Sequence, residues 1–152
     1  MSSARTFLKY WLPALLWMGT IFSASADSKS FEHSSRIIAP ILRFFFPRLP
    51  AATVDEIVFL GRKCAHLTFY AVLALLFWRA LRKPMRGDMR PWQWREARLA
   101  ILLVALYAAT DEFHQLFVPS RQALVTDVLI DITGGIVGVI LLWRAGRWLK
   151  KW

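Results

Sequence analysis

The sequence predicts an all-α membrane protein, a bundle of four transmembrane helices with an interfacial amphipathic segment in its first outer loop. Of the 152 residues, 57% are hydrophobic, whereas a soluble domain has roughly 45–50%. The 20 Lys and Arg residues lie mainly between long apolar runs. A net charge of +10 in that arrangement indicates membrane flanks rather than a nucleic-acid-binding patch. We expect one domain over residues 1–152, without a disulfide because Cys64 stands alone.

The first apolar run covers approximately residues 8–26, with Lys9 as its charged residue. Arg5 and Lys9 followed by an apolar stretch and Ala24-Ser25-Ala26 also match a signal peptide with its cleavage site. The run is long for a signal peptide, and three more apolar runs follow. We therefore expect a retained span, with cleavage as the open alternative.

The three other predicted spans cover approximately residues 61–81, 98–117 and 122–143. Each approaches the ~20 residues that cross a bilayer. The third is a span only if its last turns carry polar groups, since Asp111 and Glu112 lie there. Pro119 should end that helix and Ser120 should cap the next one. In the fourth span, Gly134-x-x-x-Gly138 predicts close approach to a neighbouring helix.

The first outer loop, roughly residues 27–60, contains an amphipathic segment. Its apolar residues fall on one helical arc, opposite Arg36 and Arg43: Ile38, Ile41, Leu42 and Phe45. Such a segment lies in a membrane interface, and Pro40 should break or begin any helix there. It would serve as a connector, with a lid over the outer side as the alternative.

The distribution of basic residues predicts the orientation. The N-terminal flank has two Lys or Arg residues, the loop between the second and third spans seven, and the C-terminal tail four; the other side holds the remaining seven. The positive-inside rule therefore places both termini of this multi-pass protein in the cytoplasm.

Polar side chains gather where three spans reach the outer side. In the second span Lys63, His66 and Tyr70 share a face, and in the fourth Asp127 and Asp131 lie one turn apart. Ionisable groups at membrane depth are costly and usually mark function. We predict a ligand-binding layer made by Lys63, His66, Tyr70, Asp111, Glu112, Gln115, Arg121, Asp127 and Asp131.

Two other interpretations of this layer remain open. It could hold only structural ion pairs, with Lys63 or Arg62 neutralising Asp111 or Glu112, and Asp127 pairing with Arg121. It could instead be catalytic, with Asp111, Glu112 and His66 as the candidate acid–base groups. We predict no metal and no cofactor, since no metal-ligand spacing such as His-Glu-x-x-His occurs.

The spacing of the polar residues resembles the VanZ-like family of bacterial membrane proteins. The matching segments are Lys63-x-x-His66-x-x-x-Tyr70, Asp111-Glu112-x-x-Gln115-x-Phe117-x-Pro119-x-Arg121, Asp127-x-x-x-Asp131-x-x-Gly134 and Phe22-Ser23-x-Ser25. This chain departs from the family by Arg62, where Asp is frequent, and by Asp131, where Asn is frequent.

The resemblance implies a role in the bacterial cell envelope, in the cytoplasmic (inner) membrane. The family is named for a member associated with resistance to the glycopeptide teicoplanin, and the resemblance implies no reaction. The first hypothesis is that the polar layer binds a lipid-linked or glycopeptide amphiphile, with membrane lipids around it and no nucleic acid. An intramembrane enzyme acting on envelope lipids and a purely structural membrane partner are the alternatives, and a proton-coupled transporter is a weaker one.

Overall fold

A computed structural model describes the chain except for residues 1–2, 26–29, 86 and 119–123. The prediction of an all-α fold is confirmed, since the described residues contain five α-helices and no strand. The helices are α1 (Ser3–Ser25), α2 (Ser30–Phe45), α3 (Ala51–Arg82), α4 (Trp94–Gln115) and α5 (Val125–Trp148).

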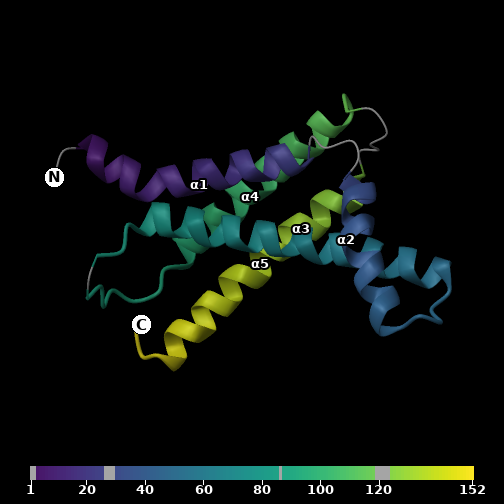
Figure 1. The fold of residues 1–152 in the computed structure, drawn as a ribbon. Helices are drawn as coiled ribbons and strands as arrows, with labels where there is room; N and C mark the ends of the chain where they lie inside the picture. The colour runs from purple at the N-terminus through teal and green to yellow at the C-terminus, as the bar shows by residue number, and fades with distance from the viewer. Residues whose placement is uncertain (1–2, 26–29, 86, 119–123) are drawn as a thin grey trace.

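Four of the helices form the bundle, and α3 lies at its centre. It contacts α1, α4 and most extensively α5, while α2 packs against α3 at one end (Figure 1). The start of α1, the α3–α4 loop and the end of α5 gather at the other end (Figure 1), where Tyr10 Oη donates to Pro84 O at 2.8 Å. We call this the basic end, because all three basic segments predicted to share one side of the membrane meet there.

Helix α3 begins ten residues earlier than predicted, at Ala51 rather than near Gly61. The predicted first outer loop is therefore too long. Pro50 precedes the first turn and fits there because the N–H it lacks is not needed. Val54 and Val58, one turn apart, are buried, so the added turns are held by packing.

The prediction that Pro40 breaks or begins a helix is wrong, because α2 runs through Pro40 from Ser30 to Phe45. A proline removes one i→i−4 hydrogen bond; here the acceptor left without that bond is the carbonyl of the exposed Arg36. The side chain of Ile38 lies near Gly61 of α3. Ile41 and Phe45 remain exposed, as expected of an interfacial helix.

The ends of α4 and α5 also differ from the prediction. α4 begins four residues early, at Trp94, and ends at Gln115. α5 begins at Val125 with Leu124 at its N-cap position, and continues to Trp148. The predicted terminator Pro119 and cap Ser120 lie outside the described residues.

Two helices, α3 and α5, are long and apolar enough to cross a membrane by length and composition. The other two predicted spans correspond to α1 and α4. Large apolar side chains such as Leu16, Leu106 and Leu141 are more than half exposed, while small residues such as Ala74 and Ala100 are buried. Small residues inside and large apolar residues outside are typical of helices packed in lipid.

A glycine seam joins α5 to α3, as the Gly134-x-x-x-Gly138 spacing predicts. A Cβ atom on Gly134 would lie 2.9 Å from Leu67 Cα, and one on Gly138 would lie 2.8 Å from Ala71 O. Because these neighbours are backbone atoms, only glycine permits this separation of the two helices.

Candidate functional site

The predicted polar side chains meet at the end of the bundle opposite the basic end. We call this group the polar cluster; in the described part of the chain it consists of Ser25, Lys63, His66, Tyr70, Asp111, Glu112, Gln115, Asp127 and Asp131. Glu112 and Asp131 each lie within electrostatic range of the three other carboxylates. The cluster is formed by α1, α3, α4 and α5, so it exists only when all four helices are assembled.

Two side-chain contacts join α3 to α5 in the cluster. Lys63 Nζ donates to Asp127 Oδ1, and His66 Nδ1 lies 3.3 Å from Asp131 Oδ1. Lys63 and Asp127 are about one-fifth exposed, at 24% and 18%, whereas Asp131 is buried. Both pairs follow from the one-turn spacing of the carboxylates on α5 and the three-residue spacing on α3.

Tyr70 and Asp111 form the link between α3 and α4. Tyr70 Oη donates to Asp111 Oδ2 at 3.3 Å, and both residues are buried. The second oxygen, Asp111 Oδ1, is buried without a hydrogen-bond donor among the described residues. A buried carboxylate oxygen without a donor is strongly destabilising, so this atom is an open acceptor.

The remaining contacts tie the end of α4 to its neighbours. Gln115 Nε2 donates to Ser25 Oγ of α1 at 2.8 Å, and Glu112 Oε1 accepts the backbone N–H of Leu124 at 2.5 Å. Glu112 therefore satisfies a backbone donor just before α5 begins. Its other oxygen has no such role in the described contacts.

The sequence-predicted site residues fall into three groups. Six are paired with one another across helices: Lys63, His66, Tyr70, Asp111, Asp127 and Asp131. Glu112 and Gln115 bind instead to the Leu124 backbone and to Ser25. Arg121 lies outside the described residues.

The pairing of Lys63 differs from the one considered in the structural alternative. Lys63 pairs with Asp127, not with Asp111 or Glu112. The reason is that Asp127 lies in the first turn of α5, the helix that α3 contacts most extensively. Ser25 was not predicted as a site residue, although Ser23 and Ser25 at the end of the first span could have indicated it.

A second polar network at the basic end was missed. The side chain of Arg82 is buried and donates to Pro91 O at 3.1 Å and to Glu96 Oε2 at 3.3 Å. Asp88 lies 3.4 Å from Arg82 Nε and 2.7 Å from Arg90 Nη2. Hydrogen bonds from Arg90 hold the pKa of Asp88 well below its usual range and raise the pKa of Arg90.

Nothing in the described ranges places three or more His, Cys, Asp or Glu side chains together as a set of metal ligands. The cluster groups are used in pairs instead. Carboxylate, imidazole and hydroxyl groups in such pairs can bind hydrogen-bond donors or transfer protons.

A family model described as VanZ/LLP1 matches residues 10–148. The chain belongs to the VanZ/LLP1 family. The match covers every residue of the polar cluster, all of α3, α4 and α5, and α1 from Tyr10 onward. No curated protein and no solved structure matches the chain. Membership of the VanZ/LLP1 family and the two apolar helices together indicate a membrane protein.

Proposed function

We propose that this VanZ/LLP1 protein is a four-span protein of the bacterial cytoplasmic membrane. Both termini would lie in the cytoplasm, because the basic segments gather at one end of the bundle (Figure 1). The polar cluster then faces the outer leaflet at headgroup depth. Helix α2, with exposed Ile41 and Phe45, would lie in the interface beside it.

We further propose that the polar cluster binds the head of a lipid-linked or glycopeptide amphiphile of the cell envelope. The observation that carries this proposal is Asp111 Oδ1, an acceptor buried without a donor among the described residues. Lys63 and His66 are already engaged by Asp127 and Asp131. The ligand would therefore present a hydroxyl or an amine to Asp111, which sugar-bearing and glycopeptide heads carry in number. We propose a role in teicoplanin resistance as the physiological consequence of this binding.

The test is the teicoplanin susceptibility of a sensitive bacterial host that expresses the wild type, Asp111→Asn or His66→Ala. The control is Asp55→Asn, which neutralises an exposed carboxylate on α3 outside the cluster. The amount of each protein in the membrane is measured by quantitative blotting. We expect resistance from the wild type and Asp55→Asn, and its loss in the two cluster variants at equal abundance.

Three other outcomes would contradict the proposal. If Asp111→Asn and His66→Ala disappear from the membrane, the cluster is structural at those positions. If every variant retains resistance, the cluster is not the binding site. If the wild type does not change susceptibility and purified protein does not bind teicoplanin or a lipid-linked sugar, the ligand class is wrong.

A catalytic function is the second candidate, favoured by the His66–Asp131 pair. A carboxylate that holds an imidazole nitrogen orients the ring and favours its action as a general base. Asp111, within electrostatic range of His66, would supply the second acid–base group. Turnover of an envelope lipid by wild-type protein, abolished in His66→Gln and in Asp111→Asn, would establish this function over simple binding.

A further inference from the structure

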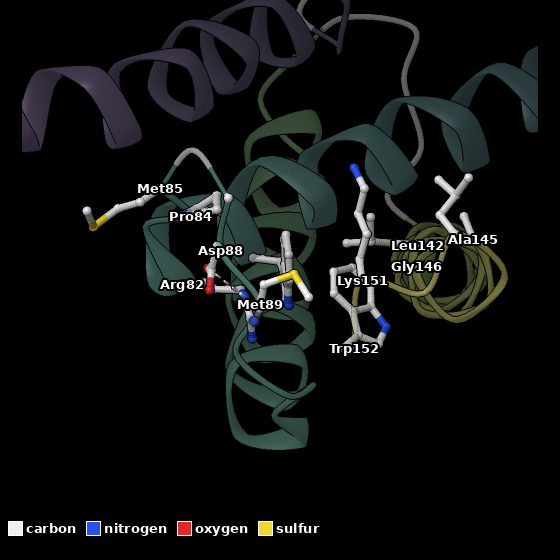
Figure 2. Close-up of a pocket in the computed structure, with 13 residues that line it drawn as sticks. Arg82, Pro84, Met85, Asp88, Met89, Leu142, Ala145, Gly146, Lys151 and Trp152 are labelled. Carbon is white, nitrogen blue, oxygen red and sulfur yellow. Dashed lines mark ion pairs between the residues drawn. The ribbon is translucent and has the colours of Figure 1, made fainter.

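The basic end contains a cavity that the proposed function does not use. It has a volume of about 400 Å³ and lies between the loop after α3 and the end of α5. Figure 2 shows Met85 and Met89 of the loop on one side, Ala145 and Leu142 of α5 on the other, and Lys151 between them. The lining is mostly apolar, with charged groups at Arg82, Asp88 and Lys151.

The turn after α5 builds one wall of this cavity. Lys150 has a φ of 51°, Lys151 N donates to Gly146 O at 2.9 Å, and Lys150 N donates to Arg147 O at 3.1 Å. This pair of bonds is a Schellman motif, which reverses the chain at a helix end. The reversal places the Trp152 ring 5.9 Å from the Trp78 ring and directly over Gly146, where no side chain would fit.

The wall opposite carries an unused hydrogen-bond donor. Trp78 lines the cavity and is 93% buried, being 7% exposed. Its indole Nε1–H has no acceptor within the part of the chain that the structure describes. A buried indole N–H normally finds a partner, so Trp78 keeps a donor that a molecule bound beside its ring could satisfy.

Of the charged residues that line the cavity, Lys151 is the one without an acidic partner among the described residues. Arg82 forms ion pairs with Asp88 and Glu96. These are the two acidic residues between Arg82 and Leu99. Lys151 is exposed at the rim, and no described carboxylate pairs with it. Lys150 is also exposed but does not line the cavity.

We propose that this cavity binds one anionic phospholipid, independently of the polar cluster. The phosphate would pair with Lys151, a phosphate or ester oxygen would accept the Trp78 N–H, and the first acyl carbons would lie against Leu142 and Met89. The charge favours an anionic headgroup, and the mostly apolar lining of a cavity of this size favours acyl chain over a small soluble anion.

The test measures phospholipid binding to the full chain in detergent, by native mass spectrometry with increasing phosphatidylglycerol or phosphatidylcholine. We expect one saturable phosphatidylglycerol and no saturable phosphatidylcholine. Lys151→Gln should weaken phosphatidylglycerol binding about fivefold, the loss of one cation beside an anionic lipid. Lys150→Gln, which removes the same charge one residue away, should change the affinity less than about twofold.

Trp78→Phe tests the second contact, because it removes the N–H while retaining a ring. We expect a two- to tenfold weaker affinity, the loss of one hydrogen bond. Equal losses in Lys150→Gln and Lys151→Gln would mean diffuse surface attraction and would overturn the proposal. So would equal binding of both lipids, displacement by inorganic phosphate alone, or preferential binding of an acidic peptide.

Discussion

Replacement of Gly138 by alanine tests whether the glycine seam sets the distance between α3 and α5. The new Cβ would lie 2.8 Å from Ala71 O and 3.0 Å from Ala71 Cα, whereas ordinary contacts begin at 3.4 Å. Both neighbours are backbone atoms, so no side chain can rotate away. The helices must therefore separate locally by about 0.6 Å, the difference between 3.4 and 2.8 Å.

The expected destabilisation follows from two opposing effects. Overpacking of a well-packed contact costs about 1–3 kcal/mol. Alanine in a helix is more favourable than glycine by up to about 1 kcal/mol. Gly19→Ala isolates the second effect, because no atom lies within 4 Å of a Cβ at Gly19 in α1. The free energy of unfolding should thus be lower for Gly138→Ala than for Gly19→Ala by about 1–3 kcal/mol.

The assay is denaturant unfolding of the purified full chain in one detergent, followed by tryptophan fluorescence. Gly19→Ala should unfold at or above the wild-type midpoint, and Gly138→Ala below it. Equal midpoints for the two variants would refute the reasoning, because the strain at the seam would then be absent. A lower midpoint for Gly19→Ala would show instead that flexibility of α1 supports the fold.

Three further predictions concern single polar contacts. In a double-mutant cycle of Lys63→Gln and Asp127→Asn, the free energies of unfolding should show coupling of about 1–3 kcal/mol; additive effects would mean that the pair is not formed. Asp88 stabilises the fold above its ordinary pKa of about 4, and this stabilisation is lost as the pH falls toward the lower folded-state pKa. The melting temperature of Asp88→Asn should therefore fall less steeply between pH 5 and pH 3 than that of the wild type. Parallel dependences of the melting temperature on pH would contradict the contact between Asp88 and Arg90. Glu112→Gln retains an oxygen for the Leu124 N–H, so Glu112→Ala should be less stable than Glu112→Gln by about 1–3 kcal/mol; equal stabilities would show that this bond is unimportant.

The helix faces of the polar cluster could be predicted because they depend on spacing alone. Lys63, His66 and Tyr70 recur at helical intervals, and so do Asp127 and Asp131. The partner of each group could not be predicted. It depends on the separation and vertical register of α3 and α5, which the seam determines through backbone contacts.

Two features at the ends of α3 were missed for different reasons. The N-terminal ten residues of α3 precede Gly61, and Asp55 and Glu56 interrupt their apolar run. The burial of Val54 and Val58 depends on tertiary contacts. At the other end Arg82 looks like Arg79 or Lys83, a charge flanking a span. Only the structure shows that Arg82 is buried against tryptophan rings. Its Cζ lies 5.6 Å from the centroid of the Trp78 ring and 5.7 Å from that of the Trp152 ring.

The buried Arg82 has a consequence for the order in which the chain assembles. Its carboxylate and carbonyl partners all lie within fourteen residues after it. The α3–α4 hairpin can therefore close its connecting turn during synthesis, before α5 has been made. The polar cluster is different, since Asp127 and Asp131 arrive only with α5. We expect a nascent chain released before residue 124 to hold a stable hairpin whose Lys63 and His66 still lack their carboxylate partners.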